Sequence, residues 1–423
     1  MKVNKSIFLQ WVLFFLNPFL SFLFSLYLLV IKKKRISYLV LSSSIALFLA
    51  YAPLMYDMSS NYYLTLSATY LSENFNYLRP YNAFILFIAK SINVEFMTII
   101  LYFYIFILTI WFVVFNYYRS LALKQWQYLF LYAILFSSII FRSITDLNRF
   151  YLSISILLLI FYFIEIRKIK NIFIILALAI VSILIHISSA VFIFLYLISF
   201  LKIHFRYFIF LPILGLIFGI FSSQVIDLML HTPFFSFFDS NTYERFVAYS
   251  SNQSEFGIYD IRGRILILRI IEFSLMIFIY FKTILYLKNN QNDILIKYLM
   301  ILLSLALFLF DYRTFYERTS IVFFLFAAIL IYRMIIAKEK DMFLILIVGL
   351  FFLRFLFINL VLYGYIYTSA YNHVLKNHDN KIGMALKPLY YPTLLLLNIG
   401  NNGYSDIYIQ NESLRGRDYI DYL

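Results

Sequence analysis

Two arginines stand at the beginning of strongly apolar segments, where a charged side chain is difficult to accommodate. Arg149 lies within residues 147–151, and Arg318 lies within residues 316–319. A guanidinium presents a planar fork of N–H donors that holds phosphate or carboxylate through two hydrogen bonds, and it keeps its charge. The two positions predict a site for an anionic group such as a phosphate or pyrophosphate. The alternatives are local pairing with neighbouring acids and snorkelling toward water.

A histidine and an aspartate are the candidates for acid–base chemistry. His186 lies deep in apolar sequence and is followed by Ser188 and Ser189. An ionisable group in such a position is a functional candidate, and histidine can act as a general base near neutral pH. The alternative is a buried histidine hydrogen-bonded to a neighbouring helix. Asp57 precedes Asn61, Tyr62 and Tyr63 in the sequence. It can bind sugar hydroxyls, act as a base or cap a helix.

Several kinds of chemistry have no matching motif. The chain contains no cysteine, which excludes disulfides, thiol nucleophiles and thiolate metal sites. It also lacks an HExxH spacing, a Walker A loop, a GxGxxG fingerprint and a serine nucleophile elbow. We therefore expect no metal and no cofactor, and we disfavour an ATP-driven pump or a hydrolase of those types.

The elements that position these residues are membrane helices. Of 423 residues, 63% are hydrophobic and 13% are charged, and the mean hydropathy is +0.86. A soluble domain of this length needs more polar surface to cover itself. The fold class is therefore all-α: a polytopic transmembrane helical bundle. The net charge of +14 then indicates basic cytoplasmic loops rather than nucleic-acid binding.

Apolar runs predict about twelve spans. The run 171–201 is too long for one span and has His186 at its middle, which predicts two short helices or a re-entrant hairpin. The predicted spans are 7–31, 37–54, 94–116, 127–141, 149–166, 171–186, 188–201, 207–223, 265–287, 295–312, 318–336 and 342–362.

Lysine and arginine are distributed differently on the two sides of this predicted bundle. The positive-inside rule assigns 12 Lys and 5 Arg to the cytoplasmic loops and 1 Lys and 9 Arg to the external ones. Topology alone does not separate two residues of equal charge, so the external arginines indicate anion binding. The external set comprises Arg79, Lys90, Arg142, Arg149, Arg245, Arg262, Arg264, Arg269, Arg313 and Arg318.

The long segments are also predicted to be external. Residues 1–362 form the predicted transmembrane domain, with external loops 55–93 and 224–264, and residues 363–423 form a polar tail that is predicted to be external as well. Tyr243 lies in a stretch of the second loop that mixes hydrogen-bond donors and aromatic rings, which suits carbohydrate binding; the alternative is a solvated loop without a binding role. The candidate substrate-binding residues are therefore Arg149, Arg318, Arg142, Arg79, Arg245, Arg313 and Tyr243.

The order of these features over roughly residues 30–335 resembles the EpsG-like and Wzy-type polymerases of bacterial surface polysaccharides, the O-antigen polymerase family. The residues that carry the resemblance are Lys32–Arg35 after the first helix, Asp57, Tyr62, Tyr63 and Pro80 in the first external loop, residues 147–153 around Arg149, residues 185–189 around His186, and Arg318-Thr319-Ser320 at a late helix.

The resemblance implies an enzyme, a metal-independent glycosyltransferase of the bacterial inner membrane. It would transfer glycan from undecaprenyl pyrophosphate to the terminal sugar of another lipid-linked oligosaccharide unit, at the external membrane face. Arg149 and Arg318 would clamp the pyrophosphate, and His186 or Asp57 would activate the acceptor hydroxyl. The implied partners are the lipid-linked oligosaccharide and the bilayer; a chain-length regulator stays open, and no nucleic acid is expected.

Two other classes of function stay open from the sequence. A lipid-linked oligosaccharide flippase handles the same lipid, but it usually has short loops and inverted repeats. A glycosyltransferase or ligase that uses a polyprenyl-phosphate sugar would carry an acid in its first external loop, as Asp57 does here.

Overall fold

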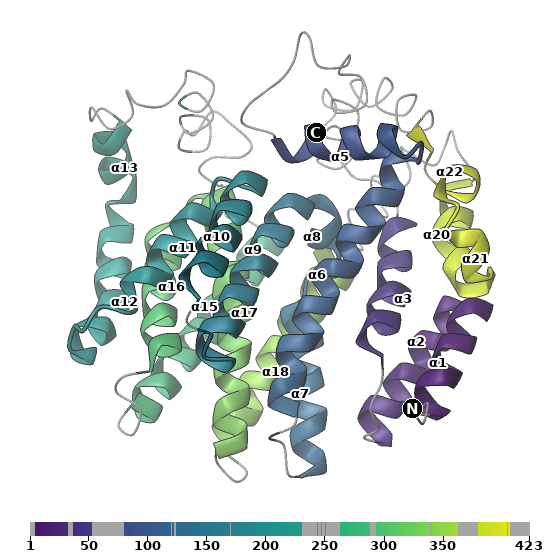
Figure 1. Cartoon of the computed structure of the whole chain (residues 1–423). Coiled ribbons are helices and arrows are strands. Elements are labelled where there is room, and N and C mark those ends of the chain that lie inside the picture. Colours follow the sequence, from purple (N-terminus) through teal and green to yellow (C-terminus); the bar gives the residue numbers. More distant parts are fainter. Residues whose placement is uncertain are drawn as a thin grey trace. The chain divides into compact units, whose positions relative to one another are not determined.

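The computed structural model describes residues 5–32, 37–52, 80–119, 121, 124–169, 171–230, 243, 247, 250, 263–287, 293–337, 341–362, 380–403, 405 and 406. These residues form helices joined by turns, and none of them lies in a strand (Figure 1). The predicted all-α fold class is confirmed for this part of the chain.

The helices form two compact units, each assembled from separate stretches of the chain. Unit 1 comprises Met1–Ser120, Ile140–Ala190 and Tyr363–Leu423, and unit 2 comprises Leu121–Ile139 and Val191–Leu362. The helices of unit 1 are α1 (Lys5–Leu16), α2 (Pro18–Leu26), η1 (Tyr27–Ile31), α3 (Tyr38–Ala50), α5 (Pro80–Ser91), α6 (Phe96–Arg119), α8 (Phe141–Asp146), α9 (Asn148–Phe161), η2 (Tyr162–Ile166), α10 (Ile172–Ile185), α20 (Asn380–Tyr390), α21 (Thr393–Leu396) and α22 (Ile399–Asn402).

The chain passes from one unit to the other within α11 (Ser189–Ile198). The other helices of unit 2 are α7 (Gln125–Ser138), α12 (Phe205–Ile220), α13 (Ser222–Leu230), α15 (Gly263–Leu287), α16 (Ile294–Phe308), α17 (Arg313–Ala337), α18 (Met342–Leu356) and η4 (Phe357–Leu362).

Some of these helices are long and apolar enough to cross a membrane. Six other apolar helices have only 10–17 residues, fewer than the roughly 20 that a span needs. The number of twelve spans is therefore not confirmed; length and composition support four, or five if the pair α12 and α13, bent by 83°, forms one span. The four are Phe96–Tyr118, Asn148–Ile166, Arg313–Ala337 and Met342–Leu362.

The break predicted at His186 is confirmed. Helix α10 ends at Ile185, and α11 begins at Ser189. The backbone N–H of His186 still donates to the carbonyl of Ser182 (3.1 Å), and the Ser189 hydroxyl donates to the carbonyl of His186 (2.8 Å). The turn satisfies its own polar groups, which an apolar environment requires.

Side-chain hydrogen bonds link the apolar helices of unit 1. The indole N–H of Trp111 on α6 donates to the hydroxyl of Ser155 on α9 (2.8 Å), and the Ser182 hydroxyl on α10 donates to the carbonyl of Ser153 on α9 (3.0 Å). Such bonds between apolar helices add stability because an apolar environment offers no other partner. They fix how α6 and α10 lie against α9, the helix that carries Arg149.

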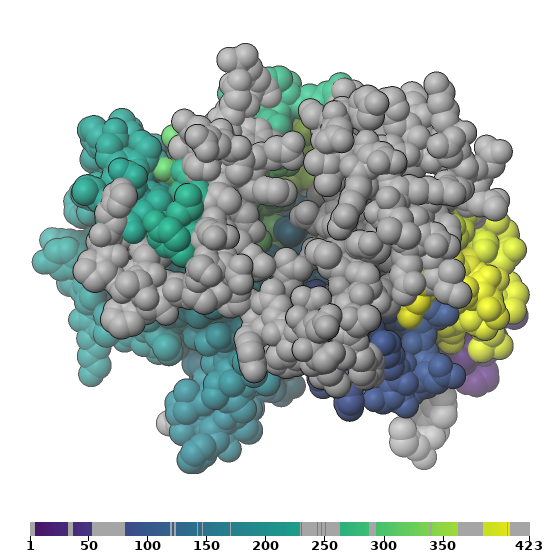
Figure 2. All heavy atoms as spheres, turned by 90° about the horizontal axis from the view of Figure 1, so that it is seen from above, coloured from purple at the N-terminus to yellow at the C-terminus, as the bar shows by residue number. Residues whose placement is uncertain are grey.

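Residues 380–402, which form α20, α21 and α22, pack on the first helices of unit 1. In Figure 2 these yellow helices lie beside the blue surface of α5 and α6. The amide of Asn17, between α1 and α2, donates to the carbonyls of Leu389 (3.2 Å) and Tyr391 (3.1 Å). The Tyr51 hydroxyl donates to the carbonyl of Leu396 (2.8 Å). Residues 380–402 are therefore an integral part of unit 1.

Two carboxyl groups hold the end of this segment. The backbone N–H of Asp406 donates to Glu95 Oε2 (2.6 Å), and the N–H of Phe96 donates to Asp406 Oδ1 (2.9 Å). Burial, with the nearby Glu95 carboxyl, raises the pKa of Asp406 from 3.8 to about 7, although the Phe96 N–H and Lys90 act in the opposite direction. At neutral pH the Asp406 carboxyl is therefore only partly ionised.

In unit 2, α12 packs closely on α16. A Cβ added to Gly215 would lie 2.3 Å from the carbonyl oxygen of Ser304, and one added to Gly219 would lie 2.7 Å from that of Leu307. The Ser304 hydroxyl donates to the carbonyl of Leu211 (2.8 Å). The two glycines let the backbones approach, as small residues do between membrane helices.

We predict that Gly215→Ala lowers the free energy of unfolding by about 1–3 kcal/mol, because the methyl group must push two backbones apart. The control is Gly349→Ala, where a Cβ meets nothing within 4 Å and helix propensity favours alanine. Thermal unfolding of the purified protein in detergent measures both. Equal midpoints for the two variants would refute the close packing.

We also predict a pH dependence from Asp406. Its pKa is about 7 in the folded state instead of the ordinary 3.8. Between these two pH values the folded protein therefore binds more protons than the unfolded chain. This contribution to stability is complete below about pH 4 and is lost as the pH rises through about 7. Asp406→Asn should flatten the change of unfolding midpoint between pH 4 and 7, and Asp311→Asn, at an exposed position, should leave it unchanged. Identical profiles for wild type and Asp406→Asn would contradict the prediction.

Candidate anion-binding site

Helix α15 carries an arginine and a glutamate one turn apart inside its apolar sequence. Arg269 and Glu272 are 6% and 3% exposed, and Arg269 Nη1 lies 3.8 Å from Glu272 Oε2. Residues three apart lie on the same face of a helix. Two opposite charges therefore enter the interior of unit 2 together.

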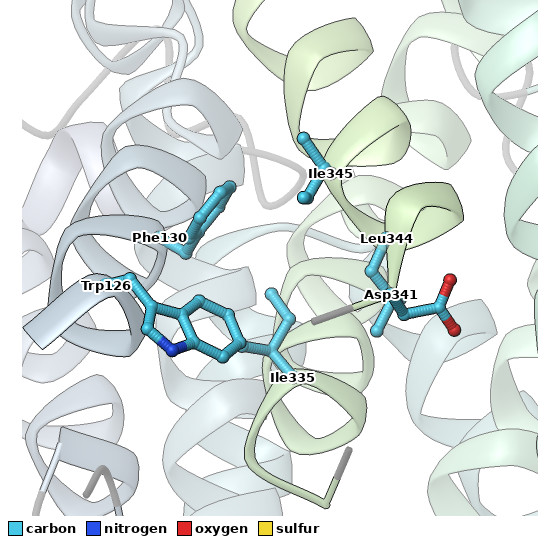
Figure 3. A pocket seen from close by; sticks show the side chains of 6 residues that line it. All are labelled: Trp126, Phe130, Ile335, Asp341, Leu344 and Ile345. Atoms are coloured by element: carbon cyan, nitrogen blue, oxygen red, sulfur yellow. The ribbon is translucent and has the colours of Figure 1, made fainter. Parts of the chain in front are cut away.

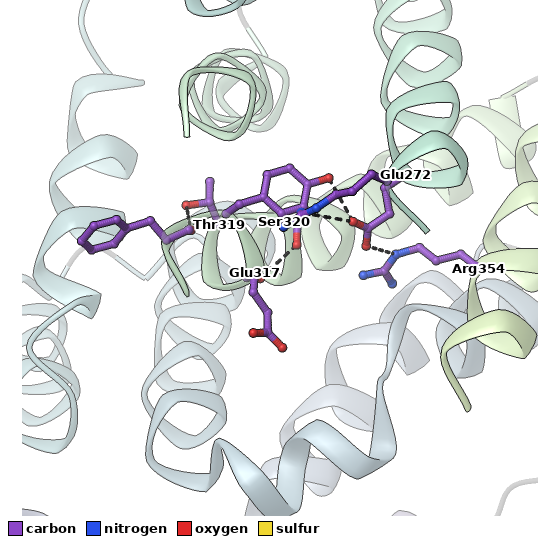
Figure 4. A network of polar contacts seen from close by, with 8 residues as sticks. Glu272, Glu317, Thr319, Ser320 and Arg354 are labelled. Carbon is purple, nitrogen blue, oxygen red and sulfur yellow. Dashed lines mark hydrogen bonds and ion pairs between the residues drawn. The ribbon is translucent and has the colours of Figure 1, made fainter. Parts of the chain in front are cut away.

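Two neighbouring helices complete the group. Arg354 Nε, from α18, donates to Glu272 Oε1 (2.8 Å), and the Tyr316 hydroxyl, from α17, donates to Glu272 Oε2 (2.9 Å). Arg354 is 1% exposed. Figure 4 shows Glu272 and Arg354 pointing toward each other from facing helices, with Glu317 turned away. We call Arg269, Glu272, Tyr316 and Arg354 the Glu272 cluster.

Aromatic rings fix both guanidinium groups. The Arg269 guanidinium carbon lies 3.5 Å from the ring centre of Tyr316, and that of Arg354 lies 4.2 Å from the ring centre of Phe324. Cation–π attraction is stronger when the cation is desolvated. The rings therefore hold the arginines in place without using their N–H donors.

The Glu272 cluster contains more positive than negative charge. Two guanidiniums face one carboxylate, so the net charge is +1 when all three are ionised. Arg269 Nε and Arg354 Nη1 are buried and have no hydrogen-bond partner among the described residues. A buried donor without a partner is costly, and an unpaired buried charge costs more. An anion with oxygen acceptors would accept hydrogen bonds from the two unpaired donors and would neutralise the excess positive charge.

The opposite ends of the same helices show a different arrangement. There, Arg333 makes a bidentate ion pair with Asp293 (2.6 and 3.3 Å), and Lys282 pairs with Asp341. In both pairs, one cationic side chain is matched by one carboxylate. These two pairs are balanced, whereas the Glu272 cluster has two cations for one acid.

A small apolar hollow lies beside Asp341 (Figure 3). Its cavity is about 10 Å³, which is room for about one water molecule. It does not accommodate a sugar or a phosphate. Elsewhere in the described part of the chain, no three acidic or histidine side chains converge as metal ligands do.

Sequence reasoning missed most of the Glu272 cluster. Arg269 was assigned to the external side only as a loop charge, and Glu272 and Arg354 were not singled out. The signal that identifies them is their position: each is an ionisable residue inside an apolar run, which is a functional candidate by default. All members lie near the start of α15 and α17 or the end of α18, the end that the topology prediction makes external.

In unit 1, His186 forms a second polar group. Its Nδ1 accepts the backbone N–H of Ser188 (3.3 Å) and lies 2.7 Å from the Ser188 hydroxyl, and its ring meets Phe150 edge-on (5.5 Å). An N–H can only donate, so Nδ1 is the accepting nitrogen. The neutral ring therefore carries its proton on Nε2.

The start of α9 lies beside this histidine. Arg149, partly buried, precedes Phe150, the residue that contacts His186. The Tyr81 hydroxyl of α5 donates to the side-chain oxygen of Asn148. The structure thus brings the chain around Arg149 next to His186. The two meet because the start of α9 lies beside the end of α10.

The remaining predicted residues fall in different places. Arg318 lies partly buried on α17, two residues after Tyr316, and Arg313 is exposed at the start of that helix. Tyr243 is 38% exposed. Arg142 belongs to α8, but its side chain is not among those described, and Asp57, Arg79 and Arg245 lie outside the described residues. Because Arg149 and Arg318 belong to different units, a joint clamp stays a prediction.

Comparison with known proteins gives no relative: no family model, no curated protein and no solved structure matches the chain.

We predict that Glu272→Ala lowers the free energy of unfolding by about 3–5 kcal/mol, because it leaves two buried guanidiniums without a counter-ion. Glu317→Ala, on the exposed face of α17, should change it by no more than about 0.5 kcal/mol. Chemical unfolding in detergent compares the two variants. A loss of similar size in both would mean that the cluster is not a buried ion network.

Proposed function

We propose that the protein is an oligosaccharide repeat-unit polymerase. It transfers glycan from undecaprenyl pyrophosphate to the terminal sugar of another lipid-linked unit, at the external face of the bacterial inner membrane. The observation that carries the proposal is the Glu272 cluster, where two buried arginines share one acid and keep two N–H donors unpaired among the described residues.

The cluster suits a phosphate-bearing lipid. In the transfer, the bond between the anomeric carbon and the pyrophosphate oxygen breaks, and negative charge develops on that oxygen. Fixed guanidinium donors in an apolar site stabilise such charge strongly, because they need no reorganisation. Ile267 and Ile270, on the same helix as Arg269, are exposed apolar side chains against which a prenyl chain can lie.

The acceptor hydroxyl loses a proton as it attacks, and His186 is the proposed recipient. The Ser188 hydroxyl, 2.7 Å from His186 Nδ1, takes the proton from the acceptor while it passes its own proton to Nδ1, which produces an imidazolium. This step is proposed for unit 1 by itself, separately from the Glu272 cluster of unit 2. Asp57 is the other candidate base from the sequence. Twelve spans, with the arginine-rich loops external, complete the proposed topology.

We predict that cells producing Arg354→Lys in place of the wild-type protein display surface glycan as single repeat units. Lysine keeps the charge but loses the fork of donors that grips a phosphate. The control is Arg333→Lys, at the balanced pair with Asp293, which should keep long chains. Gel separation of the surface glycan, at matched protein levels, measures the outcome.

Two results would decide against the polymerase. Long-chain glycan at the wild-type level in Arg354→Lys cells would remove the cluster from the reaction. Complete absence of glycan, rather than single units, would indicate a flippase, because unflipped units never reach the surface.

A further inference from the structure

We propose that Glu272 sets the charge of the anion that the cluster accepts, so that the site takes one phosphate diester group with a single negative charge. The inference rests on the proposed function, in which the pyrophosphate diester carries one such charge on each phosphate. It adds a specificity-determining residue and restricts the site to one of the two phosphates.

The charges of the cluster lead to this assignment. Arg269 and Arg354 contribute two positive charges and Glu272 one negative charge, and all three side chains are nine-tenths or more buried. In a low-dielectric interior, an uncompensated charge is expensive in either sign. An anion with one charge makes the site neutral, whereas an anion with two charges leaves a buried negative charge behind.

The hydrogen bonds of Glu272 leave a defined set of donors. Its Oε1 accepts from Arg354 Nε, and its Oε2 accepts from the Tyr316 hydroxyl and lies near Arg269 Nη1. Both oxygens are therefore engaged, and Glu272 holds the two arginines without occupying all their N–H groups. Two of the buried donors, Arg269 Nε and Arg354 Nη1, stay without a partner among the described residues, and they come from two helices.

The charge and the donor chemistry of the cluster match those of a phosphate diester. Such a group has two non-bridging oxygens that share one charge, so each oxygen can accept from one guanidinium. Its two ester arms continue away from the charged centre. A lipid-linked sugar needs that arrangement, because its prenyl and sugar parts leave the phosphate bridge in different directions.

The test uses two probes of nearly equal size and different charge. Dimethyl phosphate carries one negative charge, and methyl phosphate at pH 8 carries two, since its second pKa is about 6. The purified full-length protein in neutral detergent is heated with increasing amounts of each probe. A ligand that binds only the folded state raises the unfolding midpoint, and the dependence on concentration gives its affinity.

We expect the wild-type protein to bind dimethyl phosphate about tenfold or more tightly than methyl phosphate. Glu272→Gln keeps an acceptor oxygen but raises the net charge of the site to +2, and it should reverse the order of the two probes. Asp341→Asn, in the balanced pair with Lys282, should keep the wild-type order. Tyr316→Phe should lower the affinity for both probes and should leave dimethyl phosphate the tighter ligand.

The wild-type comparison alone can refute the inference, so it does not depend on the folding of any variant. Binding of neither probe, or tighter binding of methyl phosphate, overturns it. Equal affinity for acetate and dimethyl phosphate overturns the assignment to phosphate. The same order of probes in wild type and Glu272→Gln overturns the role of Glu272.

The outcomes separate this inference from the proposed function. If Arg354→Lys cells lose long-chain glycan but Glu272→Gln keeps the wild-type order of probes, the polymerase stands and the charge rule fails. If the order reverses but Arg354→Lys cells keep long glycan, the anion site stands and the polymerase fails.

Discussion

The structure depends on one constraint: a polar group among apolar helices needs a partner, either inside the protein or on a ligand. The Glu272 carboxylate shows the constraint most clearly, because α15, α17 and α18 each supply a donor to it or an ion-pair partner. The same requirement explains the hydrogen bond between Trp111 and Ser155 and the self-satisfied turn at His186. The charge of Glu272 on α15 is thus matched by side chains from the helices α17 and α18 that pack against it.

Local pattern was enough to predict part of this fold. Apolar runs identified the helices, and His186 with its following serines identified the break between α10 and α11. The number of spans could not be predicted in this way, because the ends of helices are set by capping and packing as well as by hydropathy. Asn17, for example, ends the first apolar run early by capping α2, which begins with Pro18.

The Glu272 cluster required information that no local pattern contains. Glu272 and Arg354 are 82 residues apart, and only the packing of α15 against α18 brings them together. Counting residues by predicted membrane side gives an excess of arginine on one side, but it does not show which arginines are buried. Balanced pairs at Asp293 and Asp341, and an unbalanced group at Glu272, are distinguishable only in three dimensions. That imbalance separates a candidate binding site from ordinary ion pairing.

The docking of the tail on α1 and α2 also determines when unit 1 can be completed during biosynthesis. Thr393 donates to the carbonyl of Phe14, and these residues are 379 positions apart in the chain. At 5–20 residues per second, a ribosome needs roughly 20–80 s to cover that distance. During this interval α1 and α2 are already synthesised, while the amide of Asn17 still lacks its carbonyl partners at Leu389 and Tyr391. All of unit 2 is synthesised meanwhile, so the packing of α1 and α2 is completed only after unit 2 has been made.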